Sequence, residues 1–434
     1  MKYLYLIFIP LLVGFPIMLF FGFDFSTNAA GINDSLFINI LMLSGIFVIF
    51  SFKKIACTRS LFWFFILPLT SIMYAKDLFL SNEMYLYYMF YLFLYVIFRH
   101  YSFPILFYKT LVVYSLVLML YVLYQNIYAF PMILHTHADS AVKALLGSGR
   151  QFATFQLPNA YAAFCITAFF IALYLYKKEH KFYYFIIALC NLGMMLLTKT
   201  FIAFGLMVLY TVIILITKKR YKQLIIGSLL VLIAGIMFFS VREFSSVEKS
   251  LQERYQNYSS AIQMYSDNSL IGVGENNFDL HYPRYQQQDA NVIHNAHSFA
   301  LQSMADHGVV GIIMVVFFGI ALYRIRASPL FPMFVVLSCY FMIDIVYYFP
   351  SIGGLFWLLY AINEPDEQIT YGRRTFAWVA ILLYVSVAIL FIKIPPKRYL
   401  RMLADERKEL HDKGLYYSAW LKTIELEEYR YNDK

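Results

Sequence analysis

The chain has 434 residues, of which 61% are hydrophobic and only 14% are charged. A soluble domain carries about 25% charged residues, so this chain has too few to cover a surface that faces water. The net charge of +9 does not indicate nucleic acid as a partner, because Lys and Arg cluster in short connectors between apolar runs. Composition therefore predicts an all-α integral membrane protein.

Runs of about 20 apolar residues recur along the chain, and each can cross a hydrocarbon core as a helix. Helices are required because lipid offers the backbone no hydrogen-bond partners. The first run lacks a small-residue cleavage site, so we expect a membrane helix rather than a cleaved signal peptide. About 12–13 transmembrane helices are predicted, at 3–22, 35–52, 61–75, 84–98, 104–128, 157–176, 182–197, 200–217, 223–240, 308–323, 329–347, 376–393 and, as a short candidate, 352–362.

Alternate connectors between these spans are rich in basic residues, and the positive-inside rule places such connectors in the cytoplasm. The segments 23–34, 76–83, 129–156 and 241–307 then face outward. The basic connectors contain Lys53, Lys54 and Arg59; Arg99 and His100; Lys177 and Lys178; Lys218, Lys219, Arg220 and Lys222; and Arg324 and Arg326.

The C-terminal end allows two topologies. If 352–362 is a tight crossing, the tail from Pro395 lies outside, and if it is re-entrant, the tail lies inside. Lys397, Arg398 and Arg401 favour the inside, whereas 414–420 resembles the helix packing of a tetratricopeptide unit, which suits either side. The expected domains are an N-terminal transmembrane bundle (1–240), an extracytoplasmic catalytic loop (241–307), C-terminal transmembrane helices (308–394) and an amphipathic helical tail (395–434).

The outward loop 241–307 is the longest non-hydrophobic stretch, and loops of this size rarely persist without a function. Arg254, Arg284, His294 and His297 lie in this loop. Arg grips phosphate oxygens in a bidentate fork, and His, with an ordinary pKa of ~6.5, exchanges protons near neutral pH. The set predicts a site for an anionic ligand, whereas any one of these residues alone is better explained as a solvated loop residue.

No metal and no cofactor are expected. His294 and His297 could share a helical face and bind a metal ion, but the only further candidate ligand nearby is Asp306, and no Cys is near. The four cysteines have no disulfide or zinc spacing. Asp344, a carboxylate within an apolar run, is a functional candidate, yet its place near the outer end of its span favours a solvated side chain.

Four stretches, in this order, carry a likeness to a known family. They are 149–162, with its Pro-Asn pair; Arg254 with Tyr258; 267–278, with Gly-Val-Gly; and 295–311, with Leu-Gln and a final Gly-x-x-Gly. Together they resemble the O-antigen ligase and polymerase superfamily of bacterial surface-glycan assembly. Ser269 stands where that family usually has Pro.

The resemblance implies a GT-C-like fold with one large extracytoplasmic loop, located in the bacterial cytoplasmic (inner) membrane. It implies a metal-independent, inverting glycosyltransferase that takes a glycan from undecaprenyl diphosphate. By matching positions, His297 and Arg254 are the catalytic residues. Arg254 would bind the diphosphate, and His297 would act as a base towards the acceptor hydroxyl or contact the diphosphate.

Further substrate-binding residues are expected around these two. Lys199 stands in place of the family's Arg, where it either offers a point charge to the diphosphate or snorkels to the interface. Glu275 is expected to orient an acceptor hydroxyl. The full expected set is Arg150, Lys199, Arg284, His294, Asn295 and Glu275.

A polysaccharide polymerase is the preferred function. The alternative is a ligase that moves the glycan to lipid A-core or another acceptor, and only the acceptor separates the two. A transporter or flippase would need charges buried mid-helix and broken spans, which are nearly absent. The expected partners are a lipid-linked glycan donor, a glycan or lipid-core acceptor, membrane lipid and other polysaccharide-assembly proteins.

Overall fold

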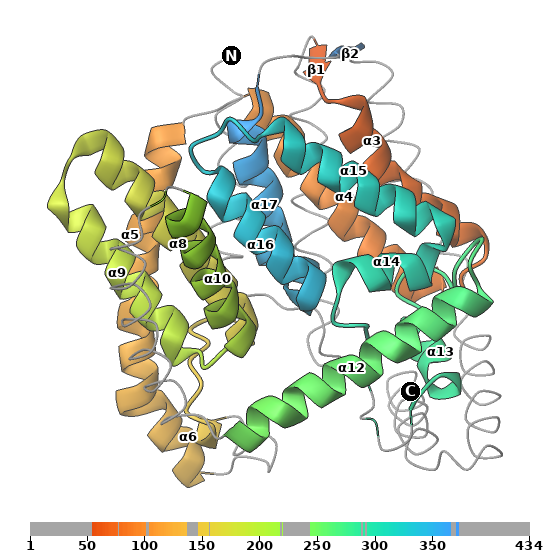
Figure 1. Cartoon of the computed structure of the whole chain (residues 1–434), viewed down its shortest axis with the longest axis horizontal. Coiled ribbons are helices and arrows are strands. Elements are labelled where there is room, and N and C mark those ends of the chain that lie inside the picture. The colour runs from red at the N-terminus through yellow and green to blue at the C-terminus, as the bar shows by residue number, and fades with distance from the viewer. Residues whose placement is uncertain are drawn as a thin grey trace, which may run out of the picture. The chain divides into compact units, whose positions relative to one another are not determined.

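The computed structural model describes residues 54–76, 78–100, 104–136, 146–155, 157–217, 219, 244–287, 290, 293–365 and 370–372. These residues are almost wholly helical, as the composition predicts (Figure 1). The sheet that they form is a small antiparallel pair, β1 Lys54–Ala56 with β2 Thr370–Gly372. The predicted spans 3–22, 35–52, 223–240 and 376–393 and the tail 395–434 lie outside the described residues.

The predicted spans that fall on described residues are largely helical, because each is a mainly apolar run bounded by Pro, Gly or basic residues. Their bounds are α3 Arg59–Ile66 with the 3-10 helix η1 Leu67–Met73, α4 Leu78–His100, α5 Pro104–Tyr124, α8 Pro158–Glu179, α9 Phe182–Leu197, α10 Phe201–Thr217, α15 Val309–Arg324, α16 Phe331–Ile343 with η4 Ile345–Tyr348, and α17 Pro350–Asn363.

Two of the described helices are long and apolar enough to cross a membrane. One runs over 31 residues from Pro104 to Leu134, because α5 continues through the π-helical turn η2 Gln125–Ala129 into α6 Phe130–Thr136. The other is α8, with 22 residues. α9, α10, α15 and α16 are apolar but shorter, so the number of crossings stays a prediction.

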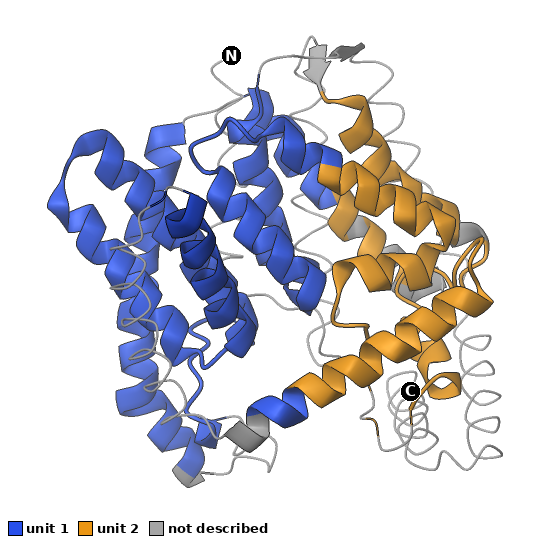
Figure 2. Cartoon of the chain, viewed as in Figure 1, with its two compact units in different colours: residues 1–51, 90–250, 320–368 blue, residues 52–89, 251–319, 369–434 orange. Residues whose placement is uncertain are grey.

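The chain forms two compact units (Figure 2). Unit 1 contains the described residues of 90–250 and 320–368, and unit 2 contains those of 52–89, 251–319 and 369–434. These boundaries follow contacts and not the predicted membrane borders, so the predicted domain division stays a prediction.

One end of unit 1 gathers residues from the predicted cytoplasmic connectors. Glu364, at the end of α17, is buried and pairs with Arg324 at 3.2 Å and with Arg99 at 3.9 Å. Nearby on α5, Lys109 lies 2.6 Å from Glu179, the last residue of α8. We call this the basic end of unit 1. Connectors that the positive-inside rule assigns to one side thus meet at one end.

α17 runs across unit 1 from the opposite end. Just before its start, the Asp344 carboxylate accepts a hydrogen bond from Asn159, at the start of α8, at 2.9 Å. At its finish, Asn363 donates to Tyr108 on α5 at 2.9 Å. Its 14 residues rise by about 21 Å between these two ends. Whether 352–362 is a crossing or a re-entrant piece stays a prediction.

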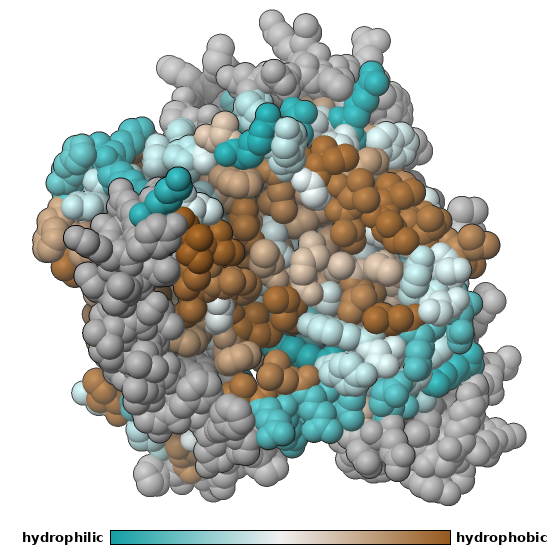
Figure 3. All heavy atoms as spheres, viewed as in Figure 1, coloured by the Kyte–Doolittle hydropathy of each residue, from teal (hydrophilic) through white to brown (hydrophobic). Residues whose placement is uncertain are grey.

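Unit 2 contains parts of two helices of different character, the apolar α15 and the hydrophilic α12. α15 exposes Ile312, Ile313 and Val316, whereas α12 Phe244–Asp267 carries mostly polar residues. Figure 3 shows hydrophobic atoms over α15 and hydrophilic atoms over α12. α12 is the helical-looking part of the predicted outward loop, and its polar surface suits water.

A small buried core in unit 2 joins α12 to the loop segments that follow it. Ala261 and Met264 of α12 share this core with Phe278, Ala296 and Ala305. Tyr282, Val273 and Ile293 complete it. The core fixes the segments on both sides of His297 against α12.

Candidate functional site

The Gly-Val-Gly motif and the Asp-His-Gly motif form one compact backbone structure. Val273 N donates to Ala305 O at 3.0 Å, and Gly274 N donates to Asp306 O at 2.9 Å. Gly272 has φ 74°, and a Cβ there would lie 2.3 Å from the Asp306 carbonyl oxygen. Only glycine fits such a close approach, which explains the residue type at this position.

His297 sits in a left-handed backbone turn directly before α14 Phe299–His307. Its φ is 53°, a conformation that costs a non-glycine residue of order 1–3 kcal/mol. Side chains hold the turn: Asn295 Oδ1 accepts from His297 N at 3.1 Å, and Gln302 Oε1 accepts from Ala296 N at 2.7 Å. Ser298 caps α14 by accepting from Leu301 N. These contacts fix where the His297 side chain leaves the backbone.

The ring of His297 has a defined orientation. Its Nδ1 lies 3.3 Å from Asn295 O, and because a carbonyl oxygen only accepts, this nitrogen donates. The proton on Nδ1 makes Nε2 the nitrogen that can accept a proton. The imidazole is half-buried.

Arg254 lies on the inward face of α12. Asn257, Ala261 and Met264 are buried and follow Arg254 at the three- and four-residue spacing of one helical face. Arg254 itself is half-buried, whereas the adjacent Tyr255 is 75% exposed. Arg254 and His297 are therefore carried by segments that pack on the same core in unit 2.

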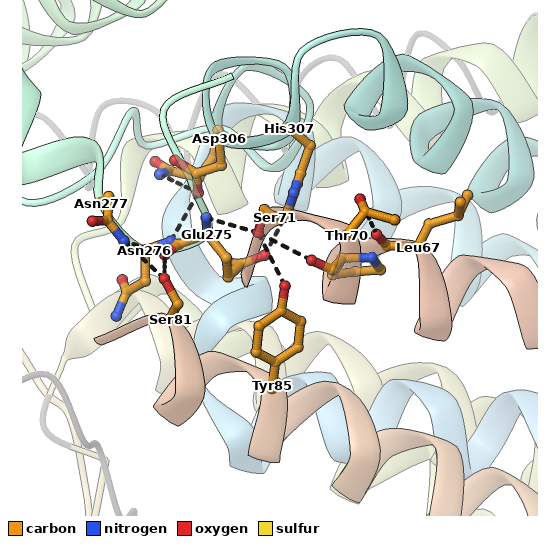
Figure 4. Close-up of polar contacts among 12 residues, drawn as sticks. Leu67, Thr70, Ser71, Ser81, Tyr85, Glu275, Asn276, Asn277, Asp306 and His307 are labelled. Carbon is orange, nitrogen blue, oxygen red and sulfur yellow. Dashed lines mark hydrogen bonds and ion pairs between the residues drawn. The ribbon is translucent and has the colours of Figure 1, made fainter. Parts of the chain in front are cut away.

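Glu275 is buried, and its carboxylate faces a histidine (Figure 4). Its Oε2 lies 2.6 Å from Nε2 of His307, the last residue of α14, and both side chains are at most 2% exposed. The backbone around Glu275 is also fixed: its N–H donates to Ser71 Oγ at 3.0 Å, and its carbonyl accepts from Ser81 Oγ at 2.6 Å. Glu275 thus lies within a closed polar cluster.

Asp306 lies beside this pair. Its Oδ2 accepts from Gln302 Nε2 at 2.9 Å and from Asn276 N at 3.3 Å. Burial, together with the nearby Glu275 carboxylate, raises the pKa of Asp306 well above its ordinary value. We call Glu275, His307, Asp306 and Gln302 the buried cluster.

Other expected site residues of the loop lie towards solvent. The side chain of His294 is 77% exposed, and its Nδ1 is 3.4 Å from Asp279 Oδ2. Arg284 ends the 3-10 helix η3 Tyr282–Arg284 and is exposed. Asn295 is half-buried in the His297 turn.

Unit 1 brings Arg150 and Lys199 together. The segment before α8 lies along the α9–α10 junction, where Gln151 N donates to Leu197 O at 3.2 Å. Arg150 Nε donates to Thr198 O at 3.1 Å, and Lys199 Nζ donates to Ser148 O at 2.8 Å. Lys199 has φ 52°. Two cations are therefore held on adjoining backbone segments.

A neutral amide links Arg150 to a buried acid. Arg150 Nη2 donates to Asn159 Oδ1 at 2.9 Å, and Asn159 Nδ2 donates to Asp344 Oδ2 at 2.9 Å. Asp344 is fully buried and caps η4 by accepting from Ile345 N at 2.8 Å. The expectation of a solvated Asp344 is wrong, because the break between α16 and η4 directs its carboxylate inward.

The sequence reasoning missed three features of these sites: the Asn159–Asp344 link, the His307 partner of Glu275 and the role of Gln302. A polar residue in an apolar run, as at Asp344, was the available signal for the first. Among the residues that the structure describes, no group of three or more His, Cys, Asp or Glu side chains is placed to hold a metal ion.

Residues 158–316 match the sequence model of the O-antigen ligase family, Wzy_C. The match covers rather more than a third of the chain and confirms the resemblance to the O-antigen ligase and polymerase superfamily over this segment. It supports a membrane protein and glycan transfer of the ligase and polymerase type in general. Lys199, Arg254, Glu275 and His297 lie inside it, and Arg150 lies just before it. Comparison with curated proteins found no match.

Proposed function

We propose that the chain is a polysaccharide polymerase. It transfers a glycan from undecaprenyl diphosphate to an acceptor hydroxyl at the outer face of the bacterial cytoplasmic membrane. The observation that carries the proposal is the shared core of unit 2, which holds the Arg254 helix and the strained His297 turn within the O-antigen ligase segment.

His297 is proposed as the general base. The acceptor oxygen bonds to the anomeric carbon while the bond from that carbon to the diphosphate oxygen breaks, which inverts the configuration. The hydroxyl proton passes to His297 Nε2, the nitrogen that the Asn295 contact leaves basic. The bonding electrons leave with undecaprenyl diphosphate.

Arg254 is proposed to bind the departing diphosphate. A guanidinium keeps its charge and presents parallel donors to two phosphate oxygens. Such donors stabilise charge that develops on the leaving group, so this part of the reaction needs no metal ion. Arg150, Lys199, Arg284, His294 and Asn295 are proposed as further substrate contacts.

The membrane arrangement is a proposal that labelling tests. We propose that α17 crosses the membrane, with Ser148 outside and both Arg326 and Pro365 inside. With the exposed Cys190 and Cys339 replaced by Ser, an impermeant maleimide should label Ser148→Cys in intact cells. Pro365→Cys and Arg326→Cys should react only after permeabilisation. External labelling of Pro365→Cys alone would contradict a crossing α17.

The function is tested by a transfer assay with purified protein, a lipid-diphosphate glycan and a chelator. His297→Ala and Arg254→Ala should each lower turnover by about 10²-fold or more, the range expected for loss of a general base or a charge-stabilising donor. His180→Ala is the matched control, because His180 also has a positive φ, 56°, but caps α8. Full activity of His297→Ala would overturn the assigned role.

The ligase alternative has its own support, since the matching family is described as O-antigen ligase. Acceptor choice separates the two functions. A polymerase extends a lipid-linked repeat into a ladder of products, whereas a ligase gives one product on lipid A-core. Activity with lipid A-core and none with lipid-linked repeats would establish the ligase.

A further inference from the structure

Gln302 connects the His297 turn to the buried cluster. Its Oε1 accepts from Ala296 N, the backbone group next to His297, at 2.7 Å. Its Nε2 donates to Asp306 Oδ2 at 2.9 Å. Both ends of one buried amide are thus occupied, so its position is fixed from two sides. A side chain held in this way transmits the position of Asp306 to the turn.

Asp306 is itself anchored. Its carboxylate accepts from Asn276 N, and its carbonyl accepts from Gly274 N at 2.9 Å. The neighbouring His307 meets Glu275 at 2.6 Å, and Glu275 is tied to Ser71 and Ser81. The contacts of Asp306 and His307 therefore fix the C-terminal end of α14, the helix that carries Gln302.

We propose that Gln302 is a positioning residue for His297, with Asp306 and the Glu275–His307 pair as its fixed base. This inference rests on the proposed function, because it takes His297 as the base of the transfer. The amide compensates part of the strain of the left-handed turn and keeps the imidazole where it can meet an acceptor hydroxyl. Displacement of about 1 Å at such a group costs up to 10²-fold in rate.

The raised pKa of Asp306, which follows from burial and the nearby Glu275 carboxylate, is compatible with this arrangement. The titratable side chains around Asp306 are Glu275, His307 and Asp279, together with the phenols of Tyr74 and Tyr85. Asp306 Oδ1 is buried and has no hydrogen-bond partner among the described residues. A neutral Asp306 still accepts from Gln302 through Oδ2.

The test compares substitutions that keep or remove the two hydrogen bonds of Gln302. Gln302→Met fills the same space without either bond, so kcat should fall by about 10–100-fold while KM for the lipid-linked donor stays within about 3-fold. Asp306→Asn keeps an acceptor for Gln302 and should retain kcat within about 3-fold. Gln263→Met, on the exposed face of α12, is the matched control.

Gln302→Glu tests the pH dependence of activity per folded molecule, which a purely structural role of Gln302 would leave unchanged. The introduced carboxylate can accept from Ala296 N, but it meets Asp306 without repulsion only while the two carboxyls share a proton. Activity per folded molecule should therefore approach wild type at acid pH and fall as pH rises, with a steeper alkaline loss than the wild type shows.

The outcomes separate this inference from the proposed function. Wild-type kcat in Gln302→Met, or a pH profile of Gln302→Glu parallel to wild type, would overturn the positioning role while His297→Ala remained inactive. A loss in Gln302→Met that merely tracks the loss of folded protein would overturn it as well. An inactive wild type with every lipid-diphosphate glycan would instead count against the proposed function.

Discussion

The two units contain polar networks of opposite design. In unit 1, the neutral amide of Asn159 links Arg150 to the buried Asp344, and the Arg150 side chain stays half-exposed. In unit 2, Glu275 and His307 meet directly and are sealed from solvent. The first network holds a cation at a half-exposed position. In the second network, Glu275 and His307 pair with each other, and hydrogen bonds to Ser71 and Ser81 fix the backbone of Glu275.

This difference predicts different failures. A buried charge that loses its partner destabilises the fold, because desolvation is no longer offset. A half-exposed cation can be lost at little cost to folding, since water replaces its contacts. Substitutions at the Glu275–His307 pair should therefore act first on stability, and substitutions at Arg150 should act first on ligand binding.

The largest expected effect comes from breaking the Glu275–His307 pair. His307→Leu leaves the Glu275 carboxylate buried without its donor, which should lower the free energy of unfolding by about 3–5 kcal/mol. The double variant Glu275→Leu with His307→Leu removes both polar groups and should recover much of the loss. Thermal unfolding in detergent measures both.

The Lys109–Glu179 pair supplies the control for this cycle. It has a similar separation, 2.6 Å, but the Lys109 side chain is 40% exposed. Lys109→Leu should leave the melting temperature nearly unchanged. If the double variant at Glu275 and His307 were as unstable as the sum of its single variants, burial of the charge would not be the cause.

Arg150 should give the next largest effect, on binding. Charge-assisted hydrogen bonds contribute about 1.5–3 kcal/mol, so Arg150→Ala should raise KM for the lipid-linked donor by about 10–100-fold with normal folding. Arg150→Lys should be intermediate, because an ammonium cannot reach both Thr198 O and Asn159 Oδ1. The control is Arg326→Ala, because Arg326 is an exposed cation that lies over the Tyr323 ring. An equal rise of KM in Arg150→Ala and Arg326→Ala would contradict the role assigned to Arg150.

The helices were predictable and the polar partners were not, for a physical reason. An apolar run bounded by Pro and basic residues specifies a helix locally, and α9 and α10 begin and end within one residue of their predicted spans. The proximity of Arg150 and Lys199 depends on how two distant segments pack. The His307 partner of Glu275 is 32 positions away, and no periodicity relates the two.

The residue types at the His297 turn illustrate the same limit. The sequence identified His297, Asn295 and the Gly-Val-Gly motif, because their chemistry or flexibility is visible in the residue itself. Gln302 was visible only as part of a motif. Its role depends on a bond to a backbone N–H six positions earlier, which only the fold of the turn creates.

The smallest predicted effect is a pH dependence of stability that Asp306→Asn should remove. The pKa of Asp306 is raised in the folded protein by burial and by Glu275, whereas an unfolded Asp titrates near ~3.9. The folded state then holds its proton more tightly, so this carboxyl favours folding at low pH, and its contribution is lost as pH rises through the folded pKa. The difference in melting temperature, Asp306→Asn minus wild type, should grow from about pH 4 upward and then level off. Parallel curves would mean that Asp306 is ionised throughout, and the buried cluster would then carry a second negative charge that Gln302 and Asn276 alone must stabilise.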